Sequence, residues 1–213
     1  ARLMMDIMGT TNMIVCRTDS EAANLLDSNI DPRDHRFILG ATVEGLEPVR
    51  VVAARAPPGA SSAAEKEWAS KAKLMRFEEA FAEAVKASSV ANKDEVIKKF
   101  MDEVAWPGLG IDAMRARAKE VLGRDLYFDW ELPRAREGYY KCRGGVDMAV
   151  TRARVFIQYG DITWMETAKP NIEEAAEFAK GVKATYPEAL MAYNLSPSFN
   201  WDAAGLTPEQ LEN

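Results

Sequence analysis

The stretch DITWMETAKPNIEEAAEFAKGVKATYPEALMAYN, residues 161–194, decides the fold. Its two ends are apolar runs, at 161–166 and 190–194, with the length of buried strands. Between them, apolar residues recur at helical spacing after Pro170, and Asn171 with Glu174 has the spacing of an N-terminal capping pair. Strand, helix and strand joined by short connections indicate a parallel βα unit.

The same pattern extends toward the N-terminus. The run LYFDW, at 126–130, predicts another strand, and NMIVCR, at 12–17, a further one. After Gly144-Gly145, a second set of apolar residues at helical spacing predicts a helix: Val146, Ala149, Val150, Ala153 and Ile157. We therefore predict an α/β fold in which these units form part of a βα array.

The middle of the chain has a different character. Residues 41–62 are rich in small residues and turn formers and show no clear period. Three helical patterns follow: one opened by Ser62 and Glu65 with Trp68, Leu74, Phe77, Phe81 and Val85 on one face, one opened by Asn92 and Glu95 with Val96, Ile97, Phe100, Met101 and Val104, and one with Met114, Ala118, Val121 and Leu122 that stops at Gly123. A helical block between strands predicts an insertion subdomain on a βα loop.

Composition excludes several function classes. The chain has 213 residues and a net charge of −6, from 33 acidic and 27 basic side chains, whereas a general nucleic-acid binder needs a basic surface. No apolar run approaches the roughly 20 residues that cross a bilayer. Two cysteines, Cys16 and Cys142, cannot build a disulfide framework or a cysteine-based zinc site, which favours a reduced intracellular compartment.

Polar residues lie at the C-terminal ends of three of the predicted strands or just beyond them. They are Arg17, Thr18 and Asp19 at the first strand, Glu166 and Thr167 at the third, and Asn194, Ser196 and Ser198 at the last. The carboxyl ends of parallel strands meet at one edge, so these side chains are expected to converge there. Arginine binds carboxylates with two parallel donors, amides and hydroxyls add neutral donors, and a glutamate can bind a metal or act as a base. The set predicts a site for a small anionic substrate, with Mg²⁺ as a candidate ion.

Structural interpretations of the same residues remain open. Arg17 and Asp19 also suit an ion pair at a strand end, Glu166 a helix cap, and Asn194 with the serines a turn. We expect Trp164 to lie in the core and His35 at the surface among charged neighbours. Cys16 is expected to be a buried, inert thiol, and Cys142 an exposed one without a neighbouring base.

Four motifs resemble isocitrate lyases. They are CRTDSEAANLLDSNIDPRDHRFILG (16–40), PRAREGYYKCRGGVDMAVTRA (133–153), ITWMETAKP (162–170) and AYNLSPSFNW (192–201). They occur in order and reach from one end of the chain to the other, most weakly across 41–125. The helical block and the NLSPSFNW form are similar to the longer eukaryotic enzymes of fungi and plants.

The resemblance implies a Mg²⁺-dependent retro-aldol cleavage of isocitrate to succinate and glyoxylate, the lyase step of the glyoxylate cycle. It implies a partial (β/α)8 TIM-type barrel, with barrel segments at 1–40 and 126–213 and a mainly helical insertion at 41–125. It also implies a homotetramer, without nucleic-acid or membrane partners. The compartment implied is the peroxisome, in its glyoxysomal form, or the cytoplasm.

By motif, the resemblance also assigns roles to residues. Arg17 would bind a substrate carboxylate, and Glu166 would lie near the metal and glyoxylate, with Trp164 as a wall of that pocket. The succinate carboxylate would be held by Asn194, Ser196 and Ser198. Arg17 and Glu166 are thus the candidate catalytic residues, and Glu166 is the one residue here placed near the metal.

One family motif has no counterpart in the chain. The KKCGH signature, which carries the candidate acid, is absent, as are the aspartates upstream of it. We expect the N-terminus of the protein to lie upstream and this segment alone to be inactive. A 2-methylisocitrate lyase, which releases pyruvate and is mitochondrial, remains an alternative, because one methyl group changes discrimination by only about 1–3 kcal/mol. A catalytically dead assembly module, acting through Trp68, Phe77 and Phe81, is a third.

Overall fold

The computed structural model describes residues 1–167 and 169–194. The chain divides into two compact units, one formed by residues 1–23 with the segment that begins at Gly144, and the other by residues 24–143. The predicted helical stretch 41–125 lies entirely inside the second unit, which also takes in the residues on either side of it. Among the helices described, none is long and apolar enough to cross a bilayer.

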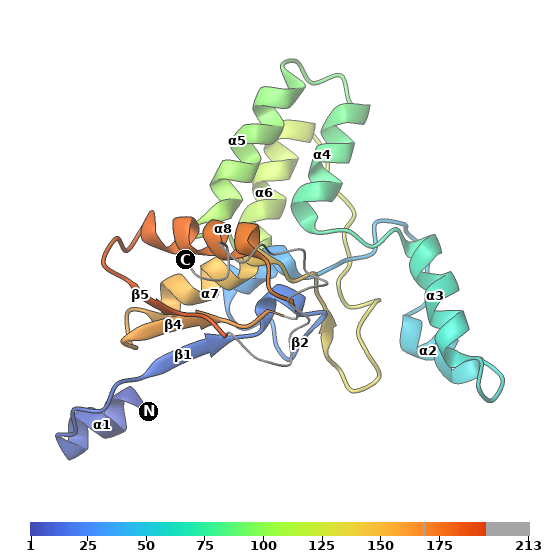
Figure 1. The fold of residues 1–213 in the computed structure, drawn as a ribbon. Coiled ribbons are helices and arrows are strands. Elements are labelled where there is room, and N and C mark those ends of the chain that lie inside the picture. The colour runs from blue at the N-terminus through green and yellow to red at the C-terminus, as the bar shows by residue number, and fades with distance from the viewer. Residues whose placement is uncertain (168, 195–213) are drawn as a thin grey trace. The chain divides into compact units, whose positions relative to one another are not determined.

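The first unit is built on a parallel sheet (Figure 1). Its strands are β1 (Val15–Thr18), β4 (Ile162–Met165) and β5 (Leu190–Ala192), in the order β1-β4-β5. In register, Arg17 lies opposite Trp164, and Trp164 lies opposite Ala192. The helices are α1 (Arg2–Met8), the short 3₁₀ helix η1 (Ser20–Ala22), α7 (Val146–Phe156) and α8 (Ile172–Lys183).

Helices α7 and α8 pack against each other, and α7 also contacts β1 and β4. The core of this unit consists of Ala149, Val150, Ala153, Met165, Phe178, Val182 and Ala189. Asn171 caps α8: its side-chain oxygen accepts hydrogen bonds from the backbone N–H groups of Glu173 (3.0 Å) and Glu174 (3.2 Å). The α/β prediction with a parallel sheet is therefore confirmed, and the predicted cap belongs to this helix.

The strand predicted at 126–130 was wrong. This segment lies in the second unit, where its one pairing is an isolated bridge between Asp129 and Ala41. Phe128 and Trp130 are nonetheless buried, with ring contacts to Phe77 (5.2 Å) and Tyr140 (5.9 Å). A short apolar run indicates burial, and burial in an irregular segment produces the same run as burial in a strand.

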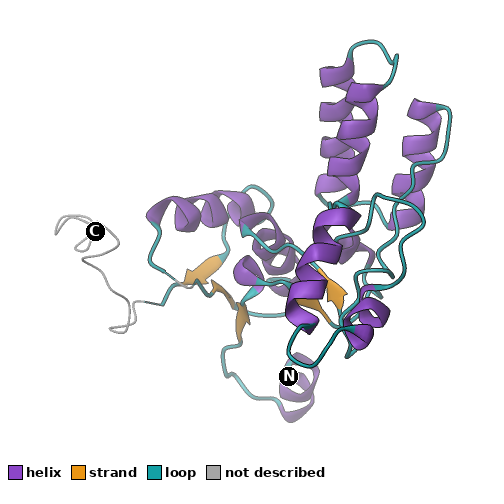
Figure 2. Cartoon of the chain, turned by 90° about the vertical axis from the view of Figure 1, so that its right-hand side faces the viewer, coloured by secondary structure: helices purple, strands orange, loops and turns teal. Residues whose placement is uncertain are grey.

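The second unit is mainly helical (Figure 2). It contains η2 (Pro32–Phe37), α2 (Val49–Arg55), α3 (Ser61–Ala72), α4 (Phe77–Ala87), α5 (Lys93–Ala105) and α6 (Ile111–Leu122). Two short strands, β2 (Leu25–Leu26) and β3 (Tyr140–Lys141), pair in antiparallel fashion. Helix α6 ends at Gly123, whose left-handed backbone (φ 69°) forms the predicted stop.

Two helix predictions in this unit need correction. The face expected to run from Trp68 to Val85 belongs to two helices, because α3 ends at Lys73 in a left-handed conformation (φ 47°) and Met75 then bridges to Gly40. Helix α2 lies in the stretch for which no period was recognised. Its seven residues span two turns, too few to produce a periodic signal.

Five side chains in this unit differ from their expected exposure or bear on the proposed assembly module. His35 is half-buried: its Nδ1 accepts from the N–H of Ile111 (2.9 Å), so its Nε2–H donates to the carbonyl of Asn29 (2.7 Å). Cys142 is 3% exposed rather than at the surface. Trp68, Phe77 and Phe81 are all buried. They fill the core of the unit and offer no exposed docking surface.

Candidate active site at the carboxyl ends of the strands

The end of β4 presents two different faces. Thr163, Met165 and Thr167 are 0%, 2% and 5% exposed, whereas the alternate residues Trp164 and Glu166 are half-buried. This is the alternation of an extended strand, with Met165 directed into the core that α7 and α8 help to form. Trp164 and Glu166 therefore lie on the face away from that core.

Arg17 reaches this second face from β1. Its Nε and Nη2 donate to the two carboxylate oxygens of Asp19, at 2.7 and 3.0 Å. Its Nη1 lies 3.9 Å from Oε2 of Glu166, and its guanidinium carbon lies 5.0 Å from the centre of the Trp164 ring. The hydrogen bonds from Arg17 hold the pKa of Asp19 below its ordinary value, and the hydrogen bond to Asp19 raises the pKa of Arg17.

The Arg17–Asp19 pair thus has the geometry of the ion pair considered as an alternative. Its two side chains are 47% and 65% exposed, so water screens the attraction and the pair adds little to stability. The pairing has a clearer effect on orientation, because a two-pronged contact fixes the plane of the guanidinium group. It leaves Nη1 on the side of Glu166.

Glu166 is held from the neighbouring strand. The side-chain amide of Asn194 donates to its Oε1 at 3.1 Å. Among residues 1–167 and 169–194, its Oε2 is enclosed and has no hydrogen-bond partner. Within the same residues, the Nε1–H of Trp164 is enclosed and has no acceptor. Because α8 is capped by Asn171, Glu166 is not the cap of that helix. A buried acceptor and a buried donor left unpaired near a guanidinium group are the features expected where a polar ligand binds.

A second contact joins the same two strand ends. The hydroxyl groups of Thr167 and Tyr193 lie 3.1 Å apart. Sequence reasoning placed Thr167 at the strand end but did not single out Tyr193. The available signal was its position beside Asn194, since adjacent residues of an extended strand point to opposite faces.

The structure therefore brings together Arg17, Trp164, Glu166 and Asn194. Ser196 and Ser198 lie outside the described residues, so their part in the site stays a prediction. Cys16, one residue before Arg17, is half-buried, and burial, with a smaller contribution from Asp161, raises the pKa of its thiol. A thiol with a raised pKa is a poor nucleophile, in line with the inert role expected for it.

Magnesium is not accounted for by these residues alone. Within 1–167 and 169–194, no group of three or more His, Cys, Asp or Glu side chains is placed to hold a metal ion. Glu166 is a single carboxylate, and its Oε2 accepts no hydrogen bond from these residues. The described residues therefore do not fit a complete Mg²⁺ site.

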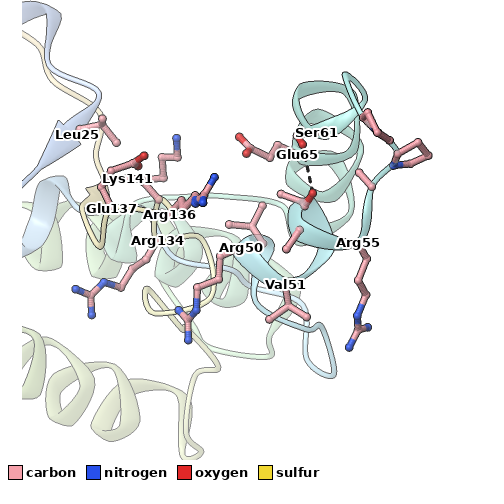
Figure 3. Close-up of a pocket in the computed structure, with 17 residues that line it drawn as sticks. Leu25, Arg50, Val51, Arg55, Ser61, Glu65, Arg134, Arg136, Glu137 and Lys141 are labelled. Atoms are coloured by element: carbon pink, nitrogen blue, oxygen red, sulfur yellow. Dashed lines mark hydrogen bonds between the residues drawn. The ribbon is translucent and has the colours of Figure 1, made fainter.

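A cavity of about 980 Å³ is lined by residues of the second unit (Figure 3). Its walls carry both signs of charge: Arg50, Arg55, Arg134, Arg136 and Lys141 against Glu65 and Glu137. Arg55 and Arg134 already contact Glu47 and Glu131, at 2.8 Å in each case. The charges nearly balance, so the cavity does not select for an anion. We place the candidate site at the strand ends.

Comparison with known proteins agrees with the motifs. The family model described as "Isocitrate lyase family" matches residues 1–213. The isocitrate lyases of Saccharomyces cerevisiae and Kluyveromyces lactis are 45% and 48% identical to the chain, over 98% of it and over 39% and 40% of their own length. A mitochondrial 2-methylisocitrate lyase of Hypocrea atroviridis is 38% identical, over 100% of the chain and 39% of its own length. The chain thus spans about two fifths of these relatives, and it belongs to the isocitrate lyase family.

Proposed function

We propose that the protein containing this chain is an isocitrate lyase, which cleaves isocitrate to succinate and glyoxylate in the glyoxylate cycle. The observation that carries the proposal is the convergence of Arg17, Glu166 and Asn194 at the ends of three neighbouring parallel strands. Identity supports the choice of substrate, since the two yeast isocitrate lyases match the chain better than the 2-methylisocitrate lyase does.

The proposed chemistry needs these residue types. A base takes the hydroxyl proton of isocitrate, a C=O bond forms on the glyoxylate half as the C–C bond breaks, and the bonding pair remains on the succinate half as a carbanion delocalised into a carboxylate. Arg17 and Asn194, with Ser196 and Ser198, would donate hydrogen bonds to carboxylates on which charge grows in the transition state. Donors already in place stabilise such charge without a cost of reorganisation at the moment of reaction.

Glu166 is assigned to the glyoxylate half. Its Oε1 accepts a hydrogen bond from Asn194, whereas its enclosed Oε2 accepts none from the described residues, so Oε2 is the atom available to substrate or to an ion-bound water. Mg²⁺ in this family would polarise the hydroxyl and carboxylate of that half. Its ligands, and the acid that protonates the carbanion, would come from parts of the longer protein, so the segment 1–213 is proposed to be inactive alone.

The complete barrel, the place of the helical insertion, the oligomeric state and the compartment are also proposals. Strands β1, β4 and β5 with helices α7 and α8 would be βα units of a (β/α)8 barrel, whose further strands would pair with β1 and β5. The predicted helical insertion, 41–125, would then be part of an insertion on the loop after β1. We also propose a homotetramer, located in the peroxisome or the cytoplasm.

The test is a product assay on the full-length protein with Mg²⁺. Isocitrate and 2-methylisocitrate are supplied in turn, and glyoxylate and pyruvate are measured separately. We expect glyoxylate from isocitrate at a kcat/KM at least about tenfold above that for pyruvate release, which corresponds to the discrimination that one methyl group provides. The reverse ratio would assign the protein to 2-methylisocitrate cleavage, and the mitochondrion would become the expected compartment. Absence of both products would refute the lyase proposal.

A further inference from the structure

The carboxyl ends of β4 and β5 are joined by two side-chain contacts. One is the hydrogen bond from Asn194 to Glu166, at 3.1 Å. The other is the pair of hydroxyl groups of Thr167 and Tyr193, also 3.1 Å apart. The sequence positions are adjacent, with 166 and 167 on one segment and 193 and 194 on the other. At each strand end, therefore, two neighbouring residues take part, and each of them makes one of the two contacts.

The two contacts lie on different sides of the strand ends. Thr167 continues the buried series of Thr163 and Met165 and is 5% exposed, so it lies on the side of the core helices. Glu166 belongs to the alternate series with Trp164 and faces Arg17. The Thr167–Tyr193 pair thus supports the Glu166–Asn194 pair from the core side of the sheet.

The backbone gives less support at this point. The paired register of β4 and β5 ends at Trp164 and Ala192, two residues short of Glu166 and Asn194. On the β1 side, the N–H of Glu166 donates to the carbonyl of Thr18 at 2.9 Å, which anchors Glu166 but not Asn194. Among the side-chain contacts described, the Thr167–Tyr193 contact can therefore hold Asn194 in position without relying on the Glu166–Asn194 hydrogen bond.

We propose that Tyr193, through Thr167, is a positioning residue of the active site. The hydroxyl pair sets the separation of the two strand ends, and with it the position of the Asn194 amide relative to Glu166. Tyr193 itself does not touch substrate in this proposal. The role in catalysis rests on the proposed lyase function, whereas the effect on the Asn194–Glu166 distance does not.

The kinetic test uses the full-length enzyme with isocitrate. Tyr193→Phe and Thr167→Val each remove one hydroxyl with little change of shape, and each should lower kcat/KM by about tenfold or more, since a misplacement of about 1 Å can cost a hundredfold. KM should rise as well as kcat fall, because Asn194 is assigned to the bound substrate. The double variant should lose no more than the worse single variant, since the two hydroxyls act as one unit.

Two controls separate positioning from a merely structural role. Thr167→Ser keeps the hydroxyl and should retain kcat and KM within about twofold, a recovery that loss of packing does not explain. Tyr159→Phe removes the hydroxyl of a tyrosine that is 65% exposed, in the turn after α7, and should leave both constants unchanged. A loss of folded enzyme would lower the apparent kcat alone and leave KM at its original value, and that result would overturn the proposal.

A crystal structure of the Tyr193→Phe variant decides the inference independently of turnover. The distance from the Asn194 amide nitrogen to Oε1 of Glu166 should lengthen from 3.1 Å to beyond about 3.5 Å, where a hydrogen bond is lost. An unchanged distance would overturn the inference even in an active lyase. If the wild-type protein cleaves no substrate, the lyase proposal fails, and this distance still shows whether Tyr193 positions Asn194.

Discussion

Because Gly144 has no side chain, the turn after β1 can lie in close contact with the residues just before α7. A Cβ atom at this position would lie 2.2 Å from the carbonyl oxygen of Ser20, and it would also meet the backbone of Glu21 and Ala23, at 2.8 and 2.7 Å. All of these neighbours are backbone atoms, which cannot turn aside as a side chain can. The substitution Gly144→Ala therefore has to move the turn that follows residues 17–19, the segment that begins with Arg17.

The size of the effect follows from these distances. The 2.2 Å approach must open by at least 0.8 Å to reach the 3.0 Å below which Cβ contacts essentially never occur. Such a shift disturbs two hydrogen bonds, from the N–H of Gly144 to the carbonyl of Ala23 (2.8 Å) and from the N–H of Gly145 to that of Ser20 (3.2 Å). At about 1 kcal/mol for each bond and about 1–3 kcal/mol for overpacking, the variant should lose roughly 3–5 kcal/mol of unfolding free energy.

The assay is urea unfolding of the purified full-length protein, where a loss of this size should lower the midpoint by about 1 M or more. Gly59→Ala is the matched control. Its added methyl meets no atom within 4 Å, but its φ of +83° imposes backbone strain, at a cost of about 1–2 kcal/mol. If Gly144→Ala loses no more stability than Gly59→Ala, the close backbone contacts do not destabilise an alanine at position 144, and the argument is refuted.

Four further outcomes are expected. Arg17→Ala should lower kcat/KM for isocitrate by about 10²–10⁴-fold, the loss of two charged hydrogen bonds, and unchanged turnover would remove Arg17 from the site. Arg17 holds the pKa of Asp19 below 3.8, so the small contribution of this pair to stability is present above pH 3.8 and is lost as the pH falls through the lowered pKa. An Asp19→Asn variant should lack this pH dependence of stability in urea titrations. Burial raises the pKa of Glu78 above 4.5 although Arg36 opposes the shift, so wild-type stability relative to Glu78→Gln should increase as the pH falls toward 4.5, and a constant difference would contradict this. His35→Ala should lose roughly 2 kcal/mol or more, because it breaks the hydrogen bonds at both ring nitrogens, and a surface residue would lose almost nothing.

The parallel βα pattern could be predicted because each of its signals is local. Val182 and Phe178 mark the buried face of α8 at helical spacing, and Asn171 marks its first turn. Strands β1, β4 and β5 are short apolar runs that end at polar residues. Their polar neighbours could be expected to meet, since parallel strands direct their carboxyl ends to one edge.

The errors have a common physical origin in long-range contacts. Phe128 is buried by Phe77, some fifty positions earlier, and its apolar neighbours therefore resemble a strand without forming one. His35 sits among charged residues in sequence, but its ring nitrogens bond to Asn29 and to Ile111. Cys142 is buried although its neighbours in sequence are basic. Phe77 and Ile111 lie outside the window that a periodicity argument can read, and Asn29, although near His35 in sequence, contacts it through its backbone carbonyl, which a pattern of side chains does not show.

The candidate site, too, could be predicted only in part from the sequence. Arg17, Glu166 and Asn194 could be named from their places at the ends of strands, and the Arg17–Asp19 ion pair was one of the interpretations left open, whereas the approach of Arg17 Nη1 to Oε2 of Glu166 depends on side-chain geometry. Tyr193 was missed because a tyrosine inside an apolar run reads as core. Its hydroxyl has a role only because Thr167 lies opposite on the next strand.

The most direct test of the central claim, that the strand ends form the active site, is a crystal structure of the full-length protein with succinate bound. We predict a succinate carboxylate within about 3 Å of the Asn194 amide and the Arg17 guanidinium, a distance typical of charge-assisted hydrogen bonds. Succinate bound away from both side chains, for example in the cavity lined by Arg50 and Arg136, would contradict the assignment.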